Sequence, residues 1–217
     1  MVLEQGVLEG RRVFGNIIKY IKMAASSNFG NMFSVVGASA FLPFLPMLPI
    51  QVLTNNLLYD FSQTTIPTDD VDAEWLTKPR QWTIGKILRF ILFIGPISSI
   101  FDYLTFFLML YIFNSWHNPA LFHTGWFVES LLTQTLIIHV IRTNKIPFIQ
   151  SRASWQLILT SLIIVAVGVW LTFSPLANTL GFVSLPPMYW LYLSIMILGY
   201  AILTQVVKTW FIHRFGE

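Results

Sequence analysis

Five oxygen-bearing side chains attract attention because they interrupt otherwise apolar stretches: Asn28, Asn31, Asn56, Asp60 and Glu129. Asn28 and Asn31 are three residues apart and Asn56 and Asp60 are four apart, so each pair shares one face of a helix. Carboxylate and amide oxygens are hard ligands that suit Mg²⁺ or Ca²⁺. Because Mg²⁺ retains water, one carboxylate with several neutral oxygens is enough. The pattern predicts a site for a hard cation.

Only three carboxylates, Asp60, Asp102 and Glu129, lie within the long apolar stretches. A charge at the centre of a bilayer costs roughly 2.5–3.5 kcal/mol, so such groups usually face a cavity or a partner. None of the basic residues lies deep in these stretches, so a cation, water or a proton must balance the charge. For Glu129 two roles remain open, cation ligand or proton holder, and for Asp102 a further one is bracing of the helices.

The amides have a second interpretation. Amides in membrane helices often only hydrogen-bond neighbouring helices, at about 0.6 kcal/mol each. For Asn28, Asn31 and Asn55 taken singly, this structural role and a ligand role are both open.

Composition indicates the elements that must position these groups. Of 217 residues, 55% are hydrophobic and 11% charged, whereas a soluble domain has about 25% charged residues. Runs such as 157–171 are apolar on every side, which excludes the alternation of a β-barrel. The sequence predicts an all-α polytopic transmembrane bundle of six spans, near 24–45, 50–66, 88–113, 125–141, 156–174 and 188–207.

The positive charges predict the orientation. All 13 basic residues precede the first span, follow the sixth, or lie between the second and third or fourth and fifth spans. The positive-inside rule then places both termini in the cytoplasm, with a stalk start at 1–23 and a tail at 208–217. This distribution explains the basic excess, so the expected partner is membrane lipid and not nucleic acid. Segment 67–86, acidic and then basic, predicts a solvated loop or a surface for a cytoplasmic partner.

The second predicted span begins just after Pro49 and is short. Transporters build ion sites near the midplane from short or interrupted helices whose freed carbonyls and polar side chains point inward. The absence of cysteine excludes a thiolate metal site.

The segments Ser27–Asn31, Pro49–Leu53, Asn56–Asp60 and Lys78–Arg80 occur in the order and spacing of a known family. In them the chain resembles the carboxyl-terminal membrane half of a P-type cation-transporting ATPase. Through 28–31, 54–60 and 125–130 it is most similar to the bacterial magnesium-transporting branch. The resemblance implies Mg²⁺ as the transported ion and a multi-pass protein of the bacterial inner membrane.

The resemblance also implies roles by position. Asn28 and Asn31 match polar positions of the fifth pump helix, Asn56 and Asp60 those of an unwound sixth, and Glu129 the acidic position of the eighth. Calcium pumps typically have a carboxylate at the position of Asn31, which argues against a two-calcium site. Proton pumps are the second choice, since a lone intramembrane aspartate can carry a proton.

The family's phosphorylation motif Asp-Lys-Thr-Gly and hinge motif Gly-Asp-Gly do not occur in the sequence. With no ATP site, the chain alone is expected not to hydrolyse ATP. It is expected to be a truncated, split or excised portion of a pump, whose missing amino-terminal half is the expected partner. Two alternatives remain open: a stand-alone six-helix channel or carrier, and a non-transporting subunit of an intact pump.

Overall fold

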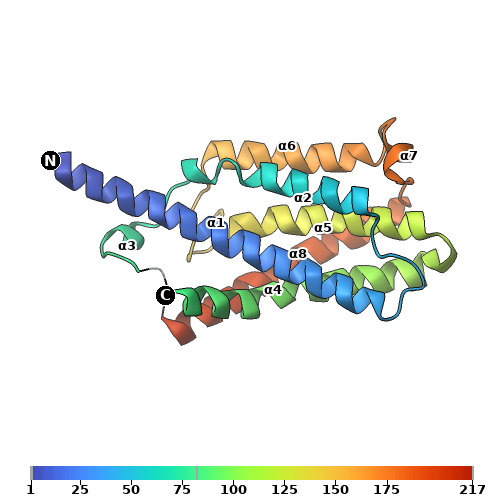
Figure 1. The fold of residues 1–217 in the computed structure, drawn as a ribbon, viewed down its shortest axis with the longest axis horizontal. Helices are drawn as coiled ribbons and strands as arrows, with labels where there is room; N and C mark the ends of the chain where they lie inside the picture. Colours follow the sequence, from blue (N-terminus) through green and yellow to red (C-terminus); the bar gives the residue numbers. More distant parts are fainter. Residues whose placement is uncertain (1, 82, 217) are drawn as a thin grey trace.

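The computed structural model describes residues 2–81 and 83–216, and every regular element within them is helical. The long helices run along one common direction (Figure 1). They are α1 (Val2–Ser39), α2 (Pro49–Gln63), α4 (Ile84–Phe107), α5 (Pro119–Ile141), α6 (Trp155–Leu171) and α8 (Pro187–Phe215). Shorter elements are α3 (Ala73–Leu76), α7 (Ala177–Leu180), the 3₁₀ turns η1 (Ile66–Thr68) and η3 (Ser115–His117), and the π-helical turn η2 (Leu108–Ile112). The prediction of an all-α fold is confirmed.

Among the described residues, three helices are both long and apolar enough to cross a bilayer: Ile84–Ile112, Pro119–Ile141 and Pro187–Phe215. Helix α6 is apolar too, but it has only 17 residues. Helix α2 is short, as expected, with 15 residues or about 22 Å of rise. It is nevertheless unbroken, so the unwinding that the family resemblance implied near Asn56 is absent from this structure.

Helix α5 is the central element. It packs against α1, α2, α4, α6 and α8, and most of its residues are buried. Its polar residues, among them Glu129, Ser130 and Gln134, are therefore buried too and do not form one solvent-facing side. Two buried apolar clusters lie around it, one that includes Phe106, Phe122 and Trp126 and one that includes Tyr59, Ile138 and Phe211.

Helices α1 and α4 approach each other closely where both carry glycine. A Cβ at Gly30 would clash with the Ser98 hydroxyl and lie 2.8 Å from the carbonyl oxygen of Gly95. A Cβ at Gly95 would lie 3.2 Å from the carbonyl oxygen of Ser26. Small residues let helix backbones pack this tightly. The contact fixes the middle of α1, which carries Asn28 and Asn31, against α4.

The helix ends follow local sequence signals. Pro49, Pro119 and Pro187 occupy the first turns of α2, α5 and α8, where the missing N–H of proline costs nothing. The side chain of Gln51 accepts a hydrogen bond from the Leu48 N–H at 3.0 Å and donates one to the Leu180 carbonyl at 2.8 Å. This side chain joins the start of α2 to the end of α7.

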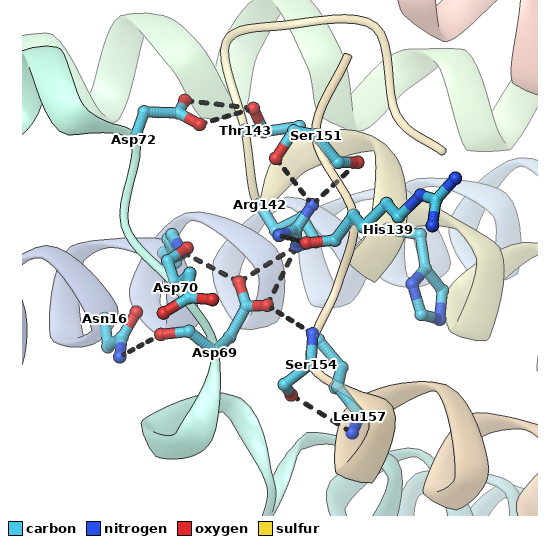
Figure 2. A network of polar contacts seen from close by, with 12 residues as sticks. Asn16, Asp69, Asp70, Asp72, His139, Arg142, Thr143, Ser151, Ser154 and Leu157 are labelled. Atoms are coloured by element: carbon cyan, nitrogen blue, oxygen red, sulfur yellow. Dashed lines mark hydrogen bonds and ion pairs between the residues drawn. The ribbon is translucent and has the colours of Figure 1, made fainter. Parts of the chain in front are cut away.

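The segment expected to be a solvated loop contains a buried anchor, Asp69, whose side chain is fully buried. Its carboxylate accepts hydrogen bonds from Lys19 Nζ at 2.8 Å, from Arg142 Nε and, at 3.1 Å, from the Ser154 N–H. Figure 2 shows these contacts converging on Asp69 from the ends of α5 and α6. Because α1 also contributes through Lys19, one aspartate fixes three helices at the end of the bundle that holds both termini (Figure 1).

Electrostatics explain why this carboxylate tolerates burial. Burial raises the pKa of Asp69. The hydrogen bonds and charges of Arg142 and Lys19 together lower it by more than burial raises it, so the pKa of Asp69 lies below its ordinary value. For Lys19, burial lowers the pKa more than Asp69 raises it. The nearby positive charge of Arg142 lowers the pKa of Lys19 as well, by a smaller amount than burial does.

Candidate cation site

A groove of about 430 Å³ lies between α1 and α2, with α5 at its base. Its polar lining comes from Asn28 and Asn31 of α1, Asn55 and Asn56 of α2, and Ser130 of α5. The remaining lining residues are Met32, Val35, Val36, Met47, Val52 and Trp126. Three of the five residues predicted from sequence, Asn28, Asn31 and Asn56, are therefore brought together.

Helical spacing explains which amides meet in the groove. Residues three apart share a helix face, so the Asn28 and Asn31 side chains leave α1 on the same side. Residues 55 and 56 differ by about 100° around α2, which leaves Asn56 exposed and Asn55 only 3% exposed. One α2 amide is thus at the open edge of the groove, and the other is on its buried side.

Asp60 lies outside the lining of this groove. It is exposed, one turn beyond Asn56 on the same face of α2. That face is otherwise apolar, with Leu53 and Leu57 also exposed. The structure confirms that Asn56 and Asp60 share a face, and it places the carboxylate at the surface of the described chain.

Glu129 is completely buried in α5. Neither of its carboxylate oxygens has a hydrogen-bond donor among the described residues, and its side chain interacts with that of Asp102. Two adjacent buried carboxyl groups cannot both be charged without large repulsion. Glu129 is thus a buried carboxyl group whose nearest charged neighbour among the described residues is Asp102.

Asp102 of α4 accepts hydrogen bonds from Ser34 Oγ of α1 at 2.6 Å and from Trp126 Nε1 of α5 at 2.7 Å. These bonds connect three helices directly below the groove wall that Trp126 forms. Of the roles left open for Asp102 by the sequence, bracing of the bundle is the one that these contacts support.

The polar set around the groove has three members that the five predicted residues did not include, Asn55, Ser130 and Gln134. Gln134 Nε2 donates to Ser130 Oγ at 2.6 Å and to Asn55 Oδ1 at 3.4 Å. The sequence signal for Gln134 was its position one turn after Ser130, beside Glu129. The sequence does not distinguish the roles of the adjacent amides Asn55 and Asn56, because it does not show which side of α2 is covered.

The chemistry of this lining is that of neutral oxygen ligands. Among the described residues, no group of three His, Asp or Glu side chains is placed to hold a metal ion. Amide and hydroxyl oxygens suit a hard cation that keeps part of its water. The groove thus has the donor type that the sequence predicted, without a carboxylate in its lining.

The chain is similar to a known protein family along most of its length. Residues 44–210 match the family model described as "Cation transporting ATPase, C-terminus". The whole chain is 56% identical, over 218 residues, to "Magnesium-transporting ATPase, P-type 1" of Escherichia coli (strain K12), and equally identical to the protein of that name from Salmonella typhimurium (strain LT2). A second protein of that name from the same Salmonella strain is 54% identical over 219 residues.

The chain spans 24% of the length of each of these relatives. The similarity covers all of α1 to α8, including the groove. The chain therefore belongs to the family of cation-transporting ATPases, as the region that corresponds to their carboxyl-terminal part.

Proposed function

We propose that this chain is the carboxyl-terminal transmembrane, cation-binding portion of a P-type ATPase that transports Mg²⁺ across the bacterial inner membrane. The observation that carries the proposal is the groove in which amides from α1 and α2 meet. Mg²⁺ as cargo is supported by the names of the relatives, which are magnesium-transporting ATPases. A lining of neutral oxygens fits an ion that gives up its water reluctantly.

The proposed topology has six spans with both termini in the cytoplasm, the stalk start at 1–23 and the tail at 208–217. The basic residues lie before the first span, in the two loops on that side, at the start of the third span (Arg89) or after the last span, and the positive-inside rule makes that side cytoplasmic. The beginning of α1 and the end of α8 also lie toward the same end of the bundle (Figure 1).

In the proposed site, Asn28, Asn31 and Asn56 supply neutral oxygens, Asp60 ligates the cation as a carboxylate, and Glu129 closes the site or exchanges a proton. Asp60 lies on an exposed face of α2, and a carboxylate that faces lipid is costly. For Asp60 to act as a ligand, another part of the pump must therefore cover this face. The amino-terminal part of the pump is the proposed cover and partner.

Helix α1 offers a route by which phosphorylation elsewhere in the pump would act on the groove. It is one continuous helix of 38 residues, from the stalk through Asn28 and Asn31. A continuous helix moves as a rod, so displacement of its first turns shifts both amides relative to α2.

The test uses the complete pump with Asp60→Ala, and Asp70→Ala as the matched control, since Asp70 is an exposed carboxylate in the loop after α2. We expect Asp60→Ala to abolish Mg²⁺ uptake into cells that lack other magnesium transporters, with normal membrane levels of the pump. Wild-type uptake in Asp60→Ala would overturn the site. Mg²⁺ flux through liposomes containing only this chain, without nucleotide, would overturn an ATP-driven role in favour of a channel.

A further inference from the structure

The buried side of the groove, where α2 meets α5, contains a hydrogen-bonded set of three polar residues: Asn55, Ser130 and Gln134. All three are at most 3% exposed. Asn55 and Ser130 line the groove, whereas Gln134 lies behind them and outside its lining. The set therefore has two residues that a cation can reach and one that contacts both of them.

Gln134 controls the position of two oxygens at once. Its Nε2 donates to Ser130 Oγ at 2.6 Å and to Asn55 Oδ1 at 3.4 Å. Each of these oxygens has a second lone pair that Gln134 does not use. Because both oxygens are bonded to one nitrogen atom, they are held near each other at the base of the groove.

Both hydrogen bonds of the Asn55 side chain are longer than usual. Its Nδ2 donates to the Phe127 carbonyl at 3.5 Å, and its Oδ1 accepts from Gln134 at 3.4 Å. Hydrogen bonds between nitrogen and oxygen in proteins are usually 2.7–3.2 Å. The Asn55 amide thus has unused capacity to bind a ligand.

A further acceptor in the set is also unused. Gln134 Oε1 is buried and has no hydrogen-bond partner among the described residues. A buried polar atom without a partner costs free energy unless a water molecule or an ion satisfies it. A water molecule behind the groove would satisfy this acceptor.

We propose that Asn55 and Ser130 bind the transported cation, directly or through its retained water, and that Gln134 is a positioning residue that orients both oxygens. This inference rests on the proposed function, because it adds a buried wall from α2 and α5 to the Asn28, Asn31 and Asn56 side of the same groove. Under this inference two amides of α2 contact the cation, the buried Asn55 and the exposed Asn56.

The experiment measures Mg²⁺ binding to the purified complete pump without nucleotide, by titration calorimetry. The Mg²⁺ binding that remains in the Asp60→Ala pump is subtracted from that of every other variant. Asn55→Ala removes a proposed ligand, and Gln134→Met keeps the length of the side chain but removes the donor. Gln63→Met is the matched control, because Gln63 is a buried amide of α2 outside the groove lining. Asn55→Asp restores an oxygen at position 55.

We expect Asn55→Ala and Gln134→Met each to weaken Mg²⁺ binding about tenfold or more, the usual effect of losing a group that orients metal ligands. Gln63→Met should bind as the wild type does, and Asn55→Asp should recover most of the lost affinity. In uptake assays the half-saturating Mg²⁺ concentration should rise while the maximal rate changes little.

Wild-type affinity in both Asn55→Ala and Gln134→Met would overturn this inference and leave the proposed function intact, provided that the wild-type pump binds Mg²⁺. Equal weakening in Gln63→Met would also overturn it, because the effect would then be a general loss of packing. If Gln134→Met does not fold, Ser130→Ala takes its place with the same expectation. Absence of Mg²⁺ binding and uptake in the wild-type pump would instead refute the proposed function, and the inference with it.

Discussion

Arg142 Nε donates to both carboxylate oxygens of Asp69, at 3.1 and 2.9 Å, although the two residues are 73 positions apart. The remaining guanidinium nitrogens of Arg142 bond to Ser151 and to the Arg152 carbonyl, in the connection to α6. Figure 2 shows Arg142 between Asp69 and Ser151. The pair therefore joins the end of α5 to the segments that follow α2 and precede α6.

We expect Asp69→Asn to lower the free energy of unfolding by about 3–5 kcal/mol, because it leaves Lys19 and Arg142 largely buried without their anion. Thermal unfolding of the detergent-purified chain measures this. The matched control is Glu74→Gln, which removes an exposed carboxylate paired with Lys145 and should change little. Equal effects of the two substitutions would contradict the anchoring role of Asp69.

The same carboxylate should make stability depend on pH at the acidic end. Burial raises the pKa of Asp69, but Arg142 and Lys19 together lower it below 3.8. A carboxyl group with a depressed folded-state pKa contributes stability that is present above the unfolded pKa and lost as the pH falls through the folded pKa. The Tm should therefore fall below about pH 4 more steeply for the wild type than for Asp69→Asn. Parallel pH profiles of the two proteins would refute the expectation.

Substitution of Gly30 should disrupt the contact between α1 and α4. In Gly30→Ala the new Cβ would clash with Ser98 and lie 2.8 Å from a backbone oxygen of α4, so a helix must shift, at about 1–3 kcal/mol of stability. In the control Gly199→Ala, the nearest atom lies 3.4 Å away, an ordinary contact. Unfolding in a denaturing detergent compares the two variants. A stable Gly30→Ala protein would show that the helices are not packed this closely.

Lys208 joins α8 to the end of α5 and should be important for stability. The residue is 1% exposed, and its Nζ donates to the carbonyls of Val140, Thr143 and Lys145 at 2.8–3.0 Å. Lys208→Met leaves these carbonyls without their donor, so we expect a loss of about 1–3 kcal/mol. Arg214→Met, which removes an exposed positive charge from the same helix, is the control and should lose far less. The Tm values of both variants decide the matter.

Sequence alone determined the features that depend on near neighbours. Long apolar runs indicated helices, and Pro49 marked where α2 begins. Helical spacing indicated that Asn28 and Asn31 share a face, and both line the groove. These predictions succeeded because helix periodicity and proline geometry act within a few residues along the chain.

Only the tertiary structure decided which side of each helix is covered. Asn55 and Asn56 are adjacent in sequence, yet α5 covers only Asn55, where Gln134 reaches it from 79 positions away. Asp69 looked like part of a solvated loop until two distant cations were placed beside it. Whether a polar side chain is buried or exposed depends on such distant partners. Burial of a polar group without hydrogen-bonding or charged partners costs free energy, and only the folded chain brings several partners together.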